Sequence, residues 1–347
     1  MNNSFKPGQT WLDNNGQRIQ AHGGSIFYEN GTYYWYGENK EKTLPGTDIW
    51  HWGVRLYSSK DLYNWIDEGI ILQPDTDDVD SPLHPSSYMD RPHIIYNETT
   101  KKYVLWAKIQ GKNNVQYMIV AVSENIKGPF ALIKSFRPCE INSGDFDLVK
   151  QPDGSAVIIF EEVHSSMIIA DLTEDYTDVT GKYTRHFPQP MPPFVREAPA
   201  YFTKDSKHYM FTSGTSGYLP NPSEVAVSDG IHGEWTVLGN PHINDSKNDS
   251  FCSQITSVFK LPHKDLYIAL ADRWVPSLLQ RDDINGMEIV KALFDPATPD
   301  DLREEANRKN NSVEINTSEA EYVWLPVEWE DGKPVLRWYD EWRIEDF

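Results

Sequence analysis

Four polar residues recur at a nearly constant interval along the chain and are of types that can carry out acid–base chemistry. They are Asp90, Asp145, Glu197 and Gln254, and the intervals between them are 55, 52 and 57 residues. Hydrolysis of a glycosidic bond needs an acid that protonates the leaving oxygen and a group that activates or orients water on the opposite face of the sugar. The regular spacing predicts that these residues occupy equivalent places in a repeated structural unit and face one site.

Glu197 is the strongest candidate for the acid. It lies in an apolar segment, residues 195–202, just before an expected strand. Burial among apolar neighbours raises the pKa of a carboxyl group toward the range that suits a general acid. A structural ion pair with Arg196 is the alternative, and we favour catalysis over it.

The other three candidates each have a structural alternative of similar weight. Asp145 shares one face of a strand with Asp147, and only one of the two is expected to reach a central site. Asp90 could equally form a surface pair with Arg91. Gln254 could be a catalytic amide or a buried amide bonded to the backbone. Their common spacing, and not any one residue, carries the hypothesis.

His22 precedes two glycines, which would allow a ligand or metal to approach the backbone closely. A histidine in a tight turn is more often structural than a ligand. Because His22 stands at the start of a unit, we expect a structural and a substrate-binding role about equally.

A turn followed by a strand rich in Tyr, Trp and β-branched residues recurs five times, at 30–37, 101–107, 153–160, 206–212 and 264–270. Five such units of about four strands each predict an all-β, five-bladed β-propeller, with a two-sheet sandwich as the alternative. We expect one catalytic domain over residues 1–347, with segment 322–329 returning to close the first blade. The charges of segment 299–309 predict one short exposed helix.

The composition of the chain disfavours several classes of binding partner. The chain has 32 basic and 52 acidic residues, a net charge of −20, which disfavours nucleic acid and anionic membranes and suits a neutral substrate. Cys139 and Cys252 lie far apart, so no disulfide framework or zinc site is expected. Residues 1–8 lack the apolar core of a signal peptide, which predicts a cytoplasmic protein, or a secreted one whose signal peptide has been removed.

From roughly residue 10 onward the sequence resembles glycoside hydrolase family 43, specifically its exo-β-1,3-galactanase-like branch. The motifs that carry the resemblance are Ala21-His-Gly-Gly24, Tyr33-Tyr-Trp-Tyr-Gly-Glu38, Asp90-Arg-Pro-His-Ile-Ile-Tyr-Asn97, Gly128-Pro-Phe130, Arg196-Glu-Ala-Pro199, Ser213-Gly-Thr-Ser-Gly-Tyr-Leu-Pro-Asn221, Ser253-Gln254, Asp272-Arg-Trp274 and Tyr322-Val-Trp-Leu-Pro326.

The resemblance implies an inverting exo-glycosidase that releases galactose from β-1,3-galactan or another plant-type oligosaccharide. It makes Glu197 the general acid and Asp145 the residue that tunes its pKa and holds the sugar. The branch has a fourth-blade glutamine that positions the attacking water, matched here by Gln254, and Asp90 would supply charge beside it. The His22 turn stands where most of the family has an Asp base.

By the same resemblance, further residues are expected to line the sugar pocket: Glu38, Arg91, Tyr117 and Thr215. No cofactor is expected to be required, although family analogy allows a structural Ca²⁺ in the channel. A family 43 galactofuranosidase or arabinofuranosidase is the alternative activity. Because the first-blade Asp is absent, a non-catalytic carbohydrate-binding propeller is the alternative from another class.

Overall fold

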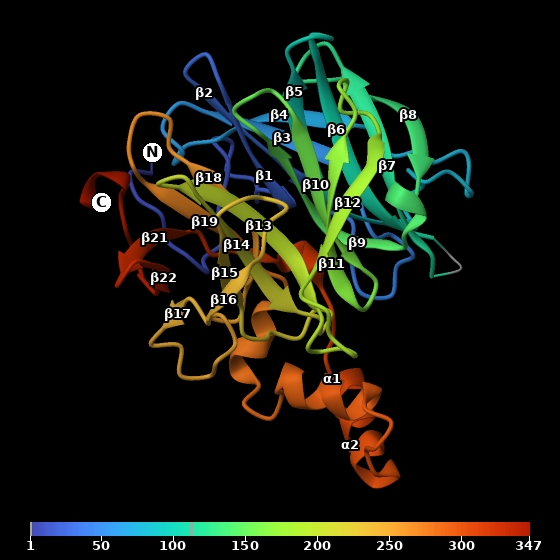
Figure 1. Ribbon diagram of the computed structural model, residues 1–347. Helices are drawn as coiled ribbons and strands as arrows, with labels where there is room; N and C mark the ends of the chain where they lie inside the picture. The colour runs from blue at the N-terminus through green and yellow to red at the C-terminus, as the bar shows by residue number, and fades with distance from the viewer. Residues whose placement is uncertain (1, 112–113) are drawn as a thin grey trace.

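The computed structural model describes residues 2–111 and 114–347, and most of its regular structure is antiparallel β-sheet (Figure 1). The strands form five separate sheets that follow one another along the chain. This is the predicted five-bladed propeller, and the two-sheet sandwich is excluded.

The blades are built from consecutive strands. The first contains β1 (His22–Glu29), β2 (Thr32–Glu38), β3 (Val54–Ser59) and β4 (Ile66–Leu72), and the second contains β5 (Tyr88–Asn97), β6 (Lys102–Gln110), β7 (Gln116–Ser123) and β8 (Ala131–Phe136). The third contains β9 (Ser143–Lys150), β10 (Ala156–Glu162), β11 (Ser166–Leu172) and β12 (Val179–His186), and the fourth contains β13 (Arg196–Lys204), β14 (Lys207–Gly214), β15 (Glu224–Ser228) and β16 (Thr236–Gly239). The fifth contains β17 (His242–Ile243), β18 (Gln254–Lys260), β19 (Tyr267–Arg273), β20 (Glu321–Tyr322), β21 (Leu325–Glu330) and β22 (Lys333–Arg337).

The hairpin that opens the first blade follows from the residues in its turn. Strands β1 and β2 are joined by Asn30 and Gly31, which both have positive φ, as a tight two-residue hairpin requires. Counted outward from the axis, each of the five predicted hairpin strands is the second strand of its blade: β2, β6, β10, β14 and β19. Strands β1, β5, β9, β13 and β18 contact their neighbours in cyclic order and surround the axis. These five inner strands position the candidate site.

The C-terminal segment does not close the first blade, and this prediction was wrong. Strands β20 and β21 both pair with β19, and the first sheet contains only β1 to β4. The ring is closed instead by side chains and by the N-terminal segment. Phe5 forms an isolated bridge with Trp342, and Gln9 forms one with Tyr322. Trp324 and Trp342 then pack in the same apolar cluster as Trp35 of the first blade.

Two helices interrupt the fifth blade between β19 and β20, namely α1 (Gly286–Phe294) and α2 (Asp300–Asn311). They project away from the sheets (Figure 1). Helix α2 is the predicted charged helix, with acidic residues in its first turn and basic residues in its last. Helix α1 was not predicted; the Asn285 side chain caps it by accepting from the Glu288 N–H. Among the described residues, no helix is long and apolar enough to cross a membrane.

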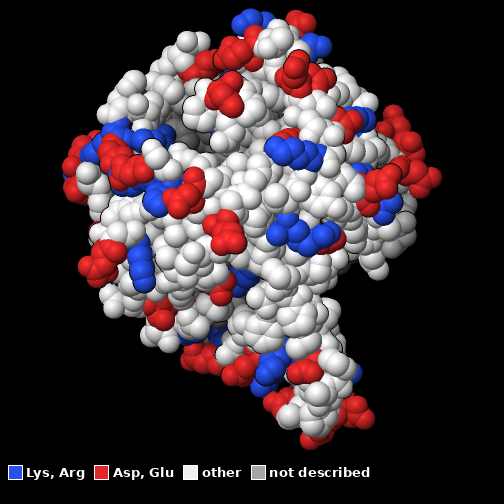
Figure 2. All heavy atoms as spheres, in the orientation of Figure 1, with Lys and Arg blue, Asp and Glu red and all other residues white. Residues whose placement is uncertain are grey.

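The charged residues on the face shown in Figure 2 are not separated by sign. On the face shown in Figure 2, Asp and Glu side chains are interspersed with Lys and Arg, and the projecting helices carry both signs. The excess of acid is therefore distributed over this face instead of forming one acidic patch.

Candidate active site

A pocket of about 220 Å³ lies where the inner strands begin, and it contains all four residues with the regular spacing. Its lining consists of Glu38, Trp50, Tyr88, Asp90, Arg91, Lys108, Gln110, Asp145, Glu197, Gly217, Tyr218, Gln254 and Trp274. Charged and amide groups from all five blades therefore face one small volume. Asp90 belongs to β5, Asp145 to β9 and Glu197 to β13.

The resemblance implied that Gln254 belongs to the fourth blade. Gln254 is instead the first residue of β18, which belongs to the fifth blade. The physical reason is the repeat itself. Residues separated by the length of one blade lie on the inner strands of adjacent blades. Gln254 follows Glu197 by one such interval, so it lies in the blade after that of Glu197.

A local irregularity accompanies each inner strand at the pocket. The pairing register shifts beside Asp90, Asp145, Glu197 and Gln254. Arg91 and Ala198, which follow Asp90 and Glu197, have φ of 56° and 50°. A β-bulge re-aims the side chain next to it, and positive φ is uncommon for residues other than glycine. The inner strands are thus bent where they present their functional side chains.

Glu197 has the electrostatic environment of a proton donor. Burial raises the pKa of Glu197 well above its ordinary value, and the negative charges of Asp145 and Glu161 raise it further, against the opposing effect of Arg91 and Lys108. The alternative, an ion pair with Arg196, does not form, because that guanidinium binds Thr212 and Glu224 instead. Glu197 can therefore remain protonated where an exposed glutamate would be ionised.

Gln254 holds Glu197 through a fully engaged amide. Its Nε2 donates to Glu197 Oε1 at 3.1 Å and to Ser213 Oγ at 2.8 Å. Its Oε1 accepts from Trp274 Nε1 at 3.1 Å and from Arg91 Nη2. An amide has two donor hydrogens and two acceptor positions, and all four are used by side chains. The alternative of an amide bonded to the backbone is excluded.

Two cations link the carboxylates. Arg91 Nη2 lies 3.1 Å from Asp145 Oδ2, and Lys108 Nζ lies 3.4 Å from Asp145 Oδ1 and 2.8 Å from Asp90 Oδ2. Arg91 therefore pairs with Asp145 of the next blade and not with its sequence neighbour Asp90. Because both cations are buried, salt screens the attractions in this network only weakly.

Asp90 remains ionised. Burial would raise its pKa, but the charges of Lys108 and Lys40, together with a hydrogen bond from Trp50 Nε1, lower the pKa of Asp90 to about 2. Buried Glu38 is its contrast, since burial raises the pKa of Glu38 to about 7 despite Lys40 Nζ at 2.8 Å. Glu38 also accepts from the backbone N–H of Arg91 at 2.9 Å, which fixes the bend after Asp90.

Three of the predicted substrate-binding residues do not line the pocket, whereas Glu38 and Arg91 do. His22 is fully buried at the start of β1, where its Nδ1 lies 2.7 Å from Asp272 and its ring stacks on Tyr322. The Thr215 hydroxyl donates to the Val195 carbonyl. Tyr117 packs against the apolar cluster between the first two blades. Each side chain is engaged by a structural partner, so its position in a motif did not bring it to the pocket surface.

Asp145 reaches the pocket and Asp147 does not. Asp147 accepts from the Tyr201 N–H at 2.8 Å and lines a different cavity, of about 290 Å³, with His93. As to the Ca²⁺ that family analogy allows, the described residues bring no three His, Cys, Asp or Glu side chains together in an arrangement that could hold a metal ion. Within residues 2–111 and 114–347, side chains of these four types therefore offer no cluster for Ca²⁺.

Several pocket residues escaped the sequence analysis. Lys108 lies in the middle of an apolar strand, where a lysine is unusual and could have been noticed. Trp50 lies in the connection between β2 and β3 of the first blade, and Tyr88 is the first residue of β5, directly after the connection to the second blade. Neither residue carries a spacing signal. Glu161 of β10 does not line the pocket itself, and its carboxylate lies beside Gly144, the residue before Asp145. Only the folded arrangement brings these residues to Glu197.

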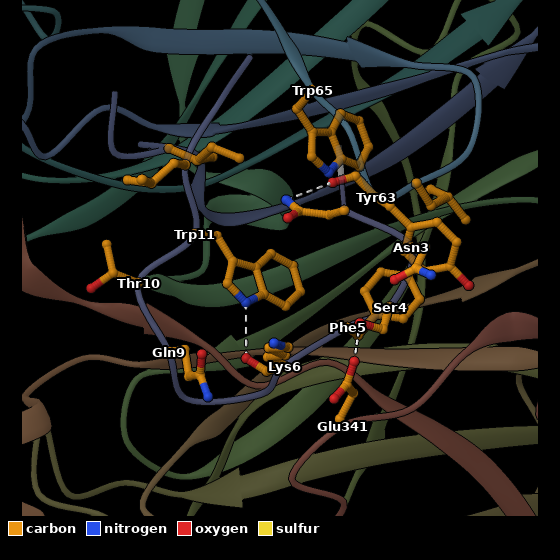
Figure 3. Close-up of a pocket in the computed structure, with 14 residues that line it drawn as sticks. Asn3, Ser4, Phe5, Lys6, Gln9, Thr10, Trp11, Tyr63, Trp65 and Glu341 are labelled. Atoms are coloured by element: carbon orange, nitrogen blue, oxygen red, sulfur yellow. Dashed lines mark hydrogen bonds between the residues drawn. The ribbon is translucent and has the colours of Figure 1, made fainter. Parts of the chain in front are cut away.

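A larger hollow, of about 410 Å³, lies elsewhere, between the N-terminal segment and the first blade (Figure 3). Trp11, Tyr63 and Trp65 contribute rings to it. Among its described lining residues Glu341 is the only carboxylate, and it accepts from Ser4 Oγ at 2.5 Å. With a single paired carboxylate, this hollow lacks the two groups that glycoside hydrolysis requires.

Comparison with known proteins agrees with this geometry. One similar solved structure is a family 43 β-1,3-galactosidase, with 31% identity and a TM-score of 0.80 over 100% of this chain and 65% of that chain. This chain thus spans less than two thirds of that protein's length. A second β-1,3-galactosidase, solved with galactodeoxynojirimycin, has 28% identity and a TM-score of 0.81 over 98% of this chain and 100% of that chain.

An exo-β-1,3-galactanase from Phanerochaete chrysosporium, solved with β-1,3-galactotriose, has 23% identity and a TM-score of 0.78 over 99% of this chain and 68% of that chain, a likeness that supports the fold alone. No curated protein matches in sequence. The sequence profile of glycosyl hydrolases family 43 matches residues 18–284. With the matched region covering most of the chain, this protein belongs to glycosyl hydrolases family 43.

Proposed function

We propose that this chain is an exo-acting hydrolase that removes galactose from the end of β-1,3-linked galactan with inversion of configuration. The observation that carries the proposal is the convergence of a buried glutamate of raised pKa, Glu197, with ionised Asp90 in one pocket. Inverting glycosidases need such a pair, one group neutral and one charged. The identity of the sugar is supported by the two β-1,3-galactosidases of similar sequence and fold.

The size of the pocket favours action at a chain end. Its volume of about 220 Å³ is small beside the ~300–1,000 Å³ of sites that enclose drug-sized ligands. One sugar unit would fill it. A polysaccharide would then be degraded one residue at a time.

The hydrogen bonds suggest how the groups divide the work. Gln254 donates to Oε1 of Glu197, so the proton of the neutral acid is left to Oε2, which would protonate the leaving oxygen. Asp90 accepts from Trp50 and Lys108 and keeps lone pairs with which it can orient a water molecule. Gln254 could bind that water only by giving up one of its four bonds. Asp145, held by Arg91 and Lys108, keeps the pKa of Glu197 high.

The proposal is tested by incubating the protein with β-1,3-galactotriose and, separately, with β-1,4-galactan, arabinan and galactofuranosyl oligosaccharides, with products separated by chromatography. We expect galactose and galactobiose from the first substrate before any complete digestion. The Glu197→Ala variant is the matched control for contaminating activity. Release of arabinose or galactofuranose would replace the proposed activity by the alternative one, and no release from any substrate would favour a binding protein.

A further inference from the structure

Two aromatic rings stack at the entrance of the pocket. The ring centroids of Trp50 and Tyr88 lie 4.2 Å apart with their planes inclined by 28°. Tyr88 is 42% exposed, which is unusual for a large ring that lines a pocket, and Trp50 is partly exposed. Neither ring belongs to one of the apolar core clusters of the described chain. The packing of the blades therefore does not account for this stack.

The position of Trp50 is fixed by the charged groups beneath it. Its Nε1 donates to Asp90 Oδ1 at 2.7 Å, and its carbonyl oxygen accepts from Lys40 Nζ at 2.9 Å. The Lys40 ammonium group also lies 4.6 Å from the centre of the ring, within the range of a cation–π contact. Since Lys40 is fully buried, the ring is held in place before any ligand arrives. A preorganised surface loses little conformational entropy on binding.

The stack continues into a wall of aromatic side chains. The ring centroid of Tyr218 lies 5.9 Å from that of Trp50, and the ring centroid of Trp274 lies 5.7 Å from that of Tyr218. Carboxylates and cations occupy the interior of the pocket, whereas the exposed end of the wall is Tyr88. A sugar ring has an apolar C–H face, and an aromatic ring presents a large, rigid apolar surface to it. The most exposed ring is thus placed for a sugar unit that lies outside the pocket.

We propose that the Trp50–Tyr88 stack is the binding platform for the sugar on the leaving-group side of the scissile bond, which is the second residue from the chain end. This inference rests on the proposed function, because it requires that the first sugar fills the pocket beside Glu197. The platform would make the enzyme select chains of linked sugars over single glycosides. Tyr88 is a specificity residue in this arrangement, whereas Trp50 also holds Asp90.

The test measures the kcat/KM of the Tyr88→Ala variant on two substrates. β-1,3-Galactobiose has a sugar as its leaving group, whereas β-galactosyl fluoride has only a fluoride ion, which touches no platform. We expect kcat/KM for galactobiose to fall about tenfold, mainly through KM, and kcat/KM for the fluoride to stay within twofold of the unmodified protein. Tyr88→Trp, which keeps a flat ring, should restore most of the loss.

Tyr183→Ala is the matched control, because Tyr183 is similarly exposed, at 40%, but lies on β12 outside the pocket. Tyr183→Ala should leave kcat/KM unchanged for both substrates. Equal losses of Tyr88→Ala on both substrates, or no loss on galactobiose, would overturn the platform. Failure of the proposed function would look different, because the unmodified protein would then hydrolyse neither substrate.

Discussion

Glu197 combines burial with two negative neighbours, and the consequence is a carboxyl group that keeps its proton. Asp145 and Glu161 raise its pKa through their charges, and Gln254 fixes which oxygen carries the proton. Asp90, in the same pocket, has the opposite environment, since two ammonium groups lower its pKa to about 2. Differences between neighbours, and not the residue types alone, assign the roles of the two acids.

Glu197→Gln removes the proton and keeps the shape of the side chain. Because acid catalysis supplies ~10²–10⁴-fold, kcat on β-1,3-galactobiose should fall by about that factor. On β-galactosyl fluoride, whose leaving group needs no protonation, the loss should be far smaller. Steady-state kinetics on both substrates make the comparison. Equal losses would point to a role in binding or folding instead.

Glu161→Gln removes one of the charges that raise the pKa of Glu197 without removing the side chain's volume. Glu197 acts in its protonated form, so activity is present below its raised pKa and is lost as pH rises through it. With the negative charge gone, the alkaline limb of the kcat/KM profile should move to lower pH. Glu304→Gln on the exposed helix α2 is the control and should leave the profile unchanged. An unchanged limb in Glu161→Gln would contradict this electrostatic assignment.

At the residue scale, spacing predicted the four residues that meet in the pocket, because residues one blade apart occupy equivalent places on the inner strands. It could not predict their partners. The sequence allowed an ion pair between Arg91 and its neighbour Asp90, but Arg91 pairs with Asp145 of the next blade. His22 does not line the pocket, and its imidazole is hydrogen-bonded to Asp272, 250 residues away. Such contacts exist only after the ring has closed.

At the scale of elements, bulges determine what the inner strands present. A regular strand would point alternate side chains to opposite faces. The register shifts beside Asp90 and Glu197, with positive φ at Arg91 and Ala198, turn the strand at the pocket. Alternation in the sequence predicted the strands, but it carries no signal for a positive φ at arginine or alanine. The hydrogen bond from Arg91 N–H to Glu38 is part of what holds this bend.

Helix α1 supports the aromatic wall of the pocket from outside. Ile289 is 3% exposed and packs in the same cluster as Trp274, which in turn donates to Gln254. Truncating a buried isoleucine leaves a cavity, so Ile289→Ala should lower the free energy of unfolding by ~2–5 kcal/mol. Leu302→Ala, at a position 51% exposed on α2, should change it by no more than ~0.5 kcal/mol. Urea unfolding measures both, and equal effects would contradict the proposed support.

At the scale of the whole molecule, the two ends of the chain meet at the junction of the first and fifth blades. Phe5 exchanges backbone hydrogen bonds with Trp342, and its ring lies 4.5 Å from Trp342 and 4.8 Å from Tyr63. The N-terminal segment thereby links the C-terminal segment to the first blade, which no sheet connects to the fifth. The five repeated hairpins predicted the propeller, but the apolar run of segment 322–329 did not reveal which sheet it would join.

Phe5→Ala should therefore destabilise the ring. The side chain is 2% exposed, and loss of a buried phenylalanine costs ~3–5 kcal/mol. Val237→Ala, at a position 48% exposed on β16, is the control and should stay within ~0.5 kcal/mol of the unmodified protein. Urea unfolding followed by tryptophan fluorescence measures the difference. An unchanged midpoint in Phe5→Ala would show that the ring closes without the N-terminal segment.

The stereochemistry of the first product tests the central claim most directly, because it depends on the whole arrangement of acid, sugar and water. Inversion needs a gap of ~6.5–9.5 Å between the acid and the group that orients water. Proton NMR during the first minutes of β-1,3-galactotriose hydrolysis should show α-galactose before mutarotation produces the β-anomer. Initial release of β-galactose would require a nucleophile within ~5–5.5 Å of Glu197 and would contradict the inverting mechanism proposed for this pocket.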